Sequence, residues 1–256
     1  MTFLGLAPTV DELAGVRYLF TDVDDTLTTD GQLLPQTYQA LWDLHDAGIA
    51  IIPVTGGSAG WCEHIVRAWP VARVIGESGA FVAEAETGRV KFDFWESQSG
   101  QAERQRRLLA AIAPLLGNSF ALAHDQQFRL ADVAIDIKGQ SREEVDELAA
   151  DIRATGATVA ISSIHINTWI GNYNKRAMTE RMLQHLCISS SEVAGNTAFV
   201  GDSRNDASMF GFIPNSFGVG NIMPVLDQLP FKPRWVVDRH AGLGFVDIAR
   251  VLLDAR

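Results

Sequence analysis

The sequence has few cysteines and no long apolar run. Its 256 residues include only Cys62 and Cys187, which lack the spacing of a zinc site, so we predict two isolated, buried thiols. No apolar run approaches the roughly 18 residues that cross a bilayer. Residues 1–10 lack the basic and apolar regions of a signal peptide. We therefore expect a cytoplasmic protein with no membrane partner.

Positive charge is also scarce. The chain has 21 Lys and Arg against 31 Asp and Glu, and its formal net charge is −10. Nucleic-acid binding needs a basic surface, so we expect no nucleic-acid partner. An acidic protein repels anionic substrates, and a local cation must therefore capture any substrate of that kind. Hydrophobic residues make up 47%, which is enough for a sizeable core.

Short apolar runs that each end in a polar loop dominate the two ends of the sequence. Runs bounded in this way are typical of buried parallel strands. The segments between them have apolar residues at the spacing of a helix. This alternation predicts an α/β fold, a doubly wound parallel sheet with a Rossmann-like core. The expected strands are 18–20, 49–54, 73–75, 198–200, 216–219 and 235–237, and the expected helices are 35–47, 59–69, 176–186 and 245–253.

The middle of the chain has a different pattern. Strands there are longer and alternate more, with two helical stretches among them, which predicts an antiparallel sheet with helices on one side. We expect residues 81–170 to form this α+β unit, inserted into a core made of residues 1–80 and 171–256. The expected strands are 89–95, 128–137 and 157–170, and the expected helices are 101–116 and 141–155.

Four polar loops follow four of the core strands, and parallel sheets gather such loops at one edge. The first contains Asp22 and Asp24, a carboxylate pair suited to nucleophilic attack and proton transfer. The second, Thr55 to Gly57, offers a hydroxyl and backbone N–H groups for phosphate oxygens. Taken alone, each of these loops is also an ordinary acidic turn or helix start.

The other two loops supply a cation and further acidic groups. Lys175 precedes a helix and could neutralise a phosphate, although a lone lysine is more often a solvated surface residue. Residues 201–206 carry Asp202, Asn205 and Asp206, whose oxygens suit Mg²⁺, although Asp202 could simply cap a helix. The order of all four loops after apolar strands is the stronger signal.

Together the four loops resemble the motifs of the haloacid dehalogenase superfamily. Asp22 to Leu27 matches Asp-x-Asp-x-Thr-Leu, Thr55 and Lys175 match the second and third motifs, and Gly201 to Asp206 matches Gly-Asp-x-x-Asn-Asp. The inserted unit resembles the type IIB cap of the Cof-like sugar phosphatases, sucrose-phosphate phosphatase and mannosyl-phosphoglycerate phosphatase. Two departures concern the substrate side: Ser78 replaces the usual Asn, and Gly57 stands where many relatives have Arg.

The resemblance implies a role for each motif residue. Asp22 would be the nucleophile, Asp24 the general acid and base, and Lys175 the group that orients and neutralises. Asn205 would contact Lys175 or the phosphate. The remaining implied roles are phosphoryl binding for Thr55, Gly56 and Gly57, and Mg²⁺ ligation for Asp22, Asp24 (through its carbonyl), Asp202 and Asp206.

These roles predict a Mg²⁺-dependent phosphatase that hydrolyses a small phosphorylated metabolite, such as a sugar phosphate, through an aspartyl-phosphate. His165, Asn167, Trp169 and Tyr173 are candidates for a sugar-facing wall, or alternatively cap core. A phosphotransferase or phosphosugar mutase would use the same residues. A receiver-like signalling module or a non-catalytic phospho-ligand binding protein is the alternative from another class, and the sequence leaves the oligomeric state open.

Overall fold

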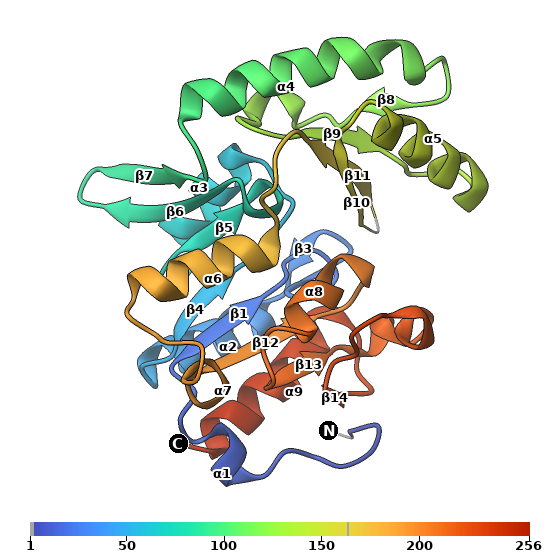
Figure 1. Cartoon of the computed structure of the whole chain (residues 1–256). Coiled ribbons are helices and arrows are strands. Elements are labelled where there is room, and N and C mark those ends of the chain that lie inside the picture. The colour runs from blue at the N-terminus through green and yellow to red at the C-terminus, as the bar shows by residue number, and fades with distance from the viewer. Residues whose placement is uncertain (1–2, 163) are drawn as a thin grey trace.

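The computed structural model describes residues 3–162 and 164–256 and shows a core below a second unit (Figure 1). The core contains a five-stranded sheet in which every pair of neighbours is parallel. Its order is β14 (Trp235–Val236), β13 (Ser216–Gly218), β12 (Thr197–Gly201), β1 (Tyr18–Thr21) and β4 (Ala50–Pro53). The central strand β1 places Tyr18 between Thr197 and Ala50.

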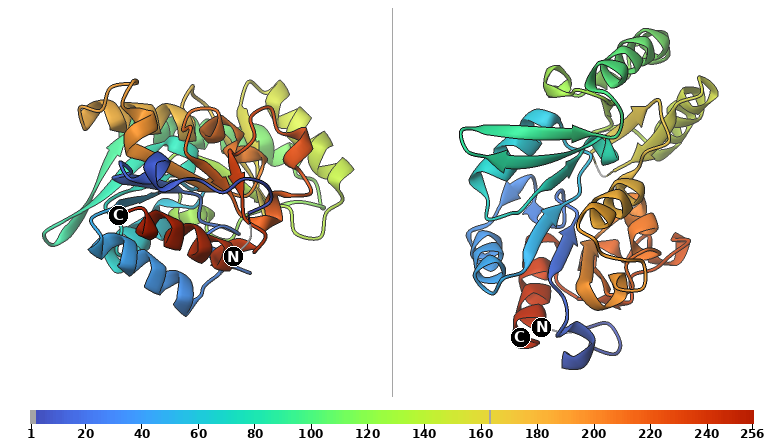
Figure 2. Two further views of the ribbon diagram at one scale, coloured as in Figure 1. Left: turned by 90° about the horizontal axis from the view of Figure 1, so that it is seen from below. Right: turned by 60° about the vertical axis from the view of Figure 1, so that its left-hand side comes forward.

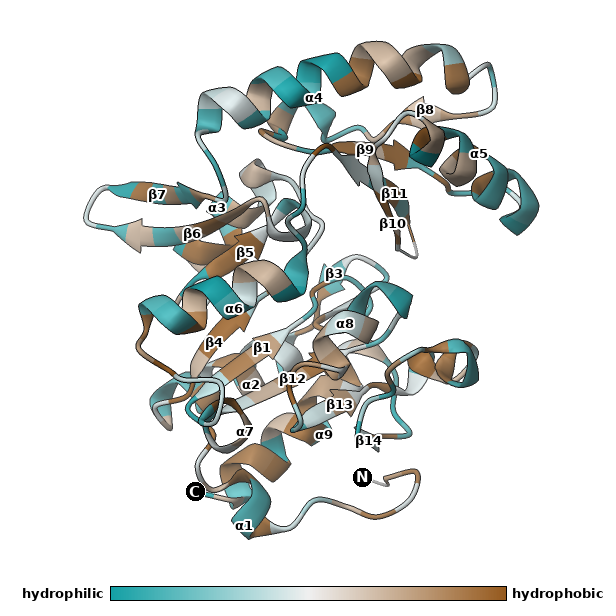
Figure 3. Ribbon diagram, in the orientation of Figure 1, coloured by the Kyte–Doolittle hydropathy of each residue, from teal (hydrophilic) through white to brown (hydrophobic). Residues whose placement is uncertain are grey.

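Both faces of this sheet are covered by helices, because the central strands are apolar on both faces. Successive residues of β1 enter opposite apolar clusters: Leu19 packs with α2 (Pro35–Asp46) and α9 (Ala241–Asp254), and Phe20 packs with α6 (Lys175–His185) and α8 (Ala207–Phe210). Figure 3 shows the apolar colour along the core strands. The predicted doubly wound α/β fold is confirmed.

A hairpin extends the core beyond β4. Val54 forms a parallel bridge to Ile75 in β5 (Val74–Gly76), and β5 pairs antiparallel with β6 (Phe81–Glu86), which pairs with β7 (Arg89–Phe94). The sequence analysis assigned this hairpin to the inserted unit. Its pairing with β5 favours moving the first boundary of that unit toward residue 97, and the division into core and cap stays a prediction.

The second unit is a four-stranded antiparallel sheet in the order β10, β11, β9 and β8, covered on one side by α4 and α5 (Figures 1 and 2). Residues from both helices and from β9 and β11 form its own apolar cluster. The predicted strand 157–170 is observed as two strands, β10 and β11, which pair antiparallel. The bounds are α4 (Gln98–Ile112), β8 (Ala121–Leu122), β9 (Val133–Asp136), α5 (Arg142–Ala154), β10 (Thr158–Ile161) and β11 (His165–Trp169).

The remaining elements are short, except for the helix that follows the second motif. They are α1 (Val10–Leu13), β2 (Thr28–Thr29), β3 (Gln32–Leu33), α3 (Ala59–Ala68) and α7 (Val193–Asn196). Across residues 3–162 and 164–256, no helix is long and apolar enough to cross a membrane.

The two cysteines differ in exposure. Both are free thiols, and Cys62 is buried as predicted, but Cys187 is exposed. Cys187 follows the end of α6 with a φ of 57°, in the left-handed conformation of a surface turn. The prediction of two buried thiols was therefore wrong for Cys187.

Candidate active site

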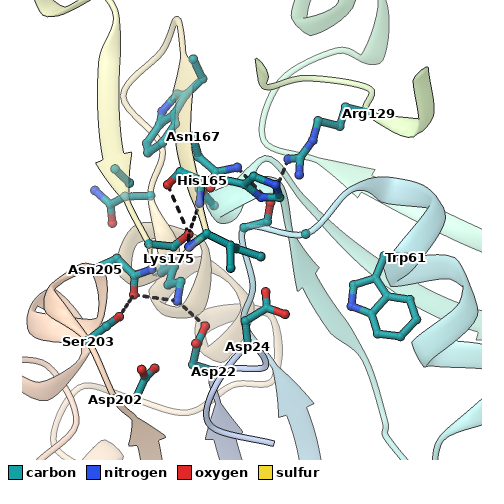
Figure 4. A pocket seen from close by; sticks show the side chains of 18 of the residues that line it. Asp22, Asp24, Trp61, Arg129, His165, Asn167, Lys175, Asp202, Ser203 and Asn205 are labelled. Atoms are coloured by element: carbon teal, nitrogen blue, oxygen red, sulfur yellow. Dashed lines mark hydrogen bonds and ion pairs between the residues drawn. The ribbon is translucent and has the colours of Figure 1, made fainter. Parts of the chain in front are cut away.

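Three carboxylates that follow two core strands meet at one point of the sheet edge, and Figure 4 shows two of them, Asp22 and Asp202. Asp22 follows β1, and its N–H donates to the carbonyl of Val200 in β12. Asp202 follows β12, and Asp206 ends the short 3₁₀ turn after it. One ligand atom from each of Asp22, Asp202 and Asp206 lies within 4.8 Å of the others, and all three residues are buried.

Lys175 lies among these carboxylates. It is the first residue of α6, whose N-terminus is capped by the side chain of Asn174. Its Nζ donates to Asp22 Oδ1 at 2.6 Å, to Asp206 Oδ1 at 2.8 Å and to Asn205 Oδ1 at 3.3 Å. The structure thus brings the first, third and fourth motifs together across more than 150 residues of sequence.

Burial and the repulsion between carboxylates shift the pKa values of the groups in this cluster. Burial, with repulsion from neighbouring carboxylates, raises the pKa of Asp22 to about 7 and that of Asp202 to about 9. Burial alone would lower the pKa of Lys175, but Asp206 and Asp22 raise it above its usual value. If all three carboxyl groups ionise, the one ammonium group leaves an excess of negative charge, which is why protons are retained here. A hard divalent cation bound by these oxygens would offset that charge in place of the protons.

Further hydrogen bonds orient the metal-ligating candidates. Asp206 Oδ2 accepts from the N–H groups of Asp202 (3.1 Å) and Ser203 (3.2 Å). Asp202 accepts from Thr26 Oγ1 at 3.1 Å and from Asn221 Nδ2 at 2.9 Å. The sequence analysis missed Asn221. It stands just beyond β13, so the rule that searches the carboxyl ends of parallel strands could have found it.

The Thr55 loop forms the next wall of the site. Gly57 N–H donates to Thr55 Oγ1 at 2.9 Å, and Gly56 and Gly57 both line a cavity that also reaches Asp22, Asp24 and Lys175. Burial raises the pKa of Asp24. A Cβ atom on Gly57 would lie 2.8 Å from Trp61 Cδ1, so any larger side chain at this position would have to displace Trp61.

The second unit closes the cavity from above. Alternate residues of β11 line it, namely His165, Asn167 and Trp169, as the pleat of a strand requires. Figure 4 shows His165 and Asn167 at this wall. Tyr173 instead stacks on Trp169, with ring centroids 5.4 Å apart and an interplanar angle of 17°. Three of the four residues suggested for a sugar-facing wall thus border the cavity, and Tyr173 packs behind them.

A buried polar link between the two units was not predicted. Glu77, which is fully buried, accepts N–H bonds from Ala59 in the core and from Leu130, Ala131 and Asp132 in the second unit. Arg129 donates to Asp132 Oδ1 at 2.8 Å and pairs with Asp125 at 3.0 Å. These hydrogen bonds form only when the two units pack together, so periodicity and short motifs in the sequence cannot predict them.

Part of the chain matches a known family, and nearly the whole chain is similar to several solved structures. The family described as haloacid dehalogenase-like hydrolase matches residues 119–229, which include Lys175 and Asp202 to Asp206. A comparison with curated proteins finds no match.

Three solved structures similar to this chain cover nearly all of it. A Thermoplasma acidophilum protein has 18% identity and a TM-score of 0.72, with 94% of this chain and 99% of that one covered. Sucrose-phosphatase from Synechocystis sp. PCC6803, solved with sucrose and phosphate, has 20% identity and a TM-score of 0.68, with 93% and 97% covered. The subclass IIB sugar phosphatase BT4131 has 16% identity and a TM-score of 0.62, with 93% and 98% covered.

The structural likenesses establish the fold, and the family match includes the third and fourth motifs in the second half of that fold. The first and second motifs complete the same site from the first half. Residues 119–229 match the haloacid dehalogenase-like hydrolase family, and the chain as a whole has a fold similar to that of the subclass IIB sugar phosphatase BT4131.

Proposed function

We propose that this chain is a Mg²⁺-dependent phosphatase that hydrolyses a small phosphorylated metabolite through an aspartyl-phosphate on Asp22. The observation that carries the proposal is the contact of Lys175 Nζ with Asp22 at 2.6 Å and Asp206 at 2.8 Å, beside Asp202. A buried ammonium group holds the proposed nucleophile beside a carboxylate set suited to a cation. This combination serves phosphoryl transfer, which depends on positioning and charge neutralisation.

Two residues divide the chemistry. A carboxylate oxygen of Asp22 attacks phosphorus as the bond to the leaving oxygen breaks, and Asp24 gives its proton to that oxygen. Asp24 then takes a proton from water, the water oxygen attacks phosphorus, and the bond to Asp22 breaks to release phosphate. Burial raises the pKa of Asp24, which favours the protonated form that the first step needs.

The cation has a definite place in this proposal. Asp22, Asp202 and Asp206 would hold it, with the Asp24 carbonyl as the resemblance implies. A bound Mg²⁺ offsets repulsion between the substrate phosphate and the acidic cluster. The remaining phosphoryl contacts fall to Lys175 and to the loop from Thr55 to Gly57.

We further propose a sugar phosphate as substrate. The likeness to a sucrose-phosphatase and a sugar phosphatase supports this choice. So does the cavity, where Trp61 can face an apolar sugar surface while His165 and Asp125 offer hydrogen bonds to hydroxyl groups.

The test is phosphate release from a panel of phosphorylated metabolites, with Mg²⁺ and with EDTA, by the wild type and by Asp22→Asn. We expect Mg²⁺-dependent release from at least one sugar phosphate, lost in EDTA and restored by excess Mg²⁺. Equal release in EDTA would contradict the metal requirement. Release only when a sugar acceptor is present would indicate a phosphotransferase instead.

A further inference from the structure

The carbonyl group of Gly56 is held by two side chains of the second unit. Arg129 Nη1 donates to it at 2.8 Å and Asn167 Nδ2 at 3.0 Å. Both side chains are buried, with 4% of each residue exposed. The phosphoryl-binding loop of the core therefore receives two hydrogen bonds from the unit above it.

Asp132 fixes both donors in place. Its Oδ1 accepts from Arg129 at 2.8 Å, and its Oδ2 accepts from Asn167 Nδ2 at 3.0 Å. The two N–H groups of the Asn167 amide thus donate to two different acceptors, and this fixes the orientation of the amide. Asp132 is anchored in turn, because its own N–H donates to Glu77 of the core at 2.9 Å. The donors reach Gly56 from a rigid frame.

The effect of this frame passes through one peptide group. In a planar trans peptide the C=O and the N–H point in opposite directions. Because the Gly56 carbonyl points toward Arg129 and Asn167, the Gly57 N–H points away from them, and it donates to Thr55 Oγ1 at 2.9 Å. Thr55 Oγ1 is thereby an acceptor toward its own loop, which leaves its O–H to act as a donor.

Packing at Gly56 supports the same account. A Cβ atom on Gly56 would lie 3.0 Å from Asn167 Oδ1 and 3.2 Å from its Cγ. The amide of Asn167 is therefore in close contact with the backbone of the loop, besides bordering the cavity.

We propose that Arg129 and Asn167 are positioning residues that hold the Gly56–Gly57 peptide and so prepare Thr55 and the loop to bind the phosphoryl group. This inference rests on the proposed phosphatase function. The cap then acts on every substrate in the same way, because it shapes the phosphoryl subsite as well as the space for the leaving group.

Asn167→Ala is the main test, and Thr168→Val is its matched control. Thr168 is the next residue of β11, is fully buried, and donates to the Thr158 carbonyl on the other face of the strand. We expect Asn167→Ala to lower kcat/KM on the order of tenfold, by the same factor for two substrates with different leaving groups. We expect Thr168→Val to stay within about twofold of wild type, since its lost bond lies away from the loop.

Binding of inorganic phosphate, measured by calorimetry with Mg²⁺ present, separates this inference from the proposed function. Weaker phosphate binding by Asn167→Ala than by Thr168→Val supports the inference, whether or not any panel substrate is hydrolysed. Unchanged phosphate binding, or a kcat/KM loss confined to one substrate, would overturn it and make Asn167 a leaving-group contact. A wild type that releases no phosphate would count against the proposed function alone.

Arg129→Lys is the second variant, used if Asn167→Ala unfolds. It keeps a positive charge between Asp125 and Asp132 but gives up the planar guanidinium that also reaches Gly56. We expect weaker phosphate binding here too, with a thermal unfolding midpoint that shows the variant to be folded. Wild-type phosphate affinity in folded Arg129→Lys would contradict the inference.

Discussion

Glu77→Gln tests whether the link between the two units depends on a buried charge. In the wild type, Oε1 of Glu77 accepts from Ala59 N (2.9 Å) and Leu130 N (2.9 Å), and Oε2 accepts from Ala131 N (2.6 Å) and Asp132 N (2.9 Å). Burial and repulsion from Asp132 raise the pKa of this carboxyl group, whereas the donated N–H bonds lower it. Together these effects raise the pKa to about 8, but a neutral acid would turn its O–H toward N–H donors that need an acceptor, and on this geometric ground we expect the charged form at pH 7.

The expected loss of stability follows from the backbone N–H groups that Glu77→Gln would leave without an acceptor. The glutamine side chain carries one N–H₂ group, and in either orientation this group faces at least one buried backbone N–H that then has no acceptor. A buried N–H group without an acceptor lowers the free energy of unfolding by about 1–3 kcal/mol. The remaining hydrogen bonds weaken because their acceptor is no longer charged. Relief of the repulsion with Asp132 offsets part of this loss. We expect a net loss of about 2–4 kcal/mol in the free energy of unfolding.

Thermal and urea unfolding of Glu77→Gln would measure this loss, and hydrogen exchange would locate it at the amides of residues 130–132. Glu84→Gln is the matched control, because Glu84 makes a partly exposed ion pair with Arg73 at 2.6 Å, and such pairs contribute about 0–1 kcal/mol. Equal stability of the two variants would refute the reasoning and indicate that Glu77 is a neutral acid.

Three other changes test the site and the surface. Asp24→Asn should lower kcat at least a hundredfold with little change in KM, measured by phosphate release, because it removes the proton donor; a pure KM effect would argue against that role. Burial, followed by the charge of Arg129, lowers the pKa of His165, so protons bind the unfolded state more strongly, and stability should fall as pH drops through about 6.5. Urea unfolding of His165→Asn should show a weaker fall than wild type, and parallel curves would contradict this. Cys62 is buried with a raised pKa whereas Cys187 is exposed, so a thiol reagent should label one cysteine in the folded protein and none in Cys187→Ser; labelling of Cys62 at the same rate would show that the fold does not protect it.

The motif residues could be predicted from the sequence because strand geometry gathers them. Asp22 and Asp202 each follow a buried strand of one parallel sheet, and neighbouring strands bring their ends together whatever the sequence distance. Lys175 was singled out by the resemblance to the third motif, since its place before a helix alone favours a surface residue. In the structure Nζ of this residue, at the start of α6, reaches Asp22. Strand topology thus accounts for the meeting of the carboxylates, and the resemblance to the four motifs accounts for the choice of Lys175.

The rest of the site depends on contacts that have no local pattern. Arg129 and Asp132 acquire their importance from Gly56 and Glu77, which belong to the other unit. Periodicity also predicted the strand 89–95 as part of an antiparallel sheet, but it gave no indication that this strand pairs with β6 or that β6 pairs with β5. Cys187 was placed inside because cysteines are usually buried, yet it stands in the turn that ends α6.

The central claim is that Asp22 carries the phosphoryl group, and peptide mapping after a rapid acid quench tests it most directly. Wild type mixed with its best panel substrate and Mg²⁺ should show the mass of one phosphoryl group on the peptide that contains Asp22, and Asp22→Asn should show none and release no phosphate. A phosphoryl group on another residue, or undiminished phosphate release by Asp22→Asn, would contradict the account.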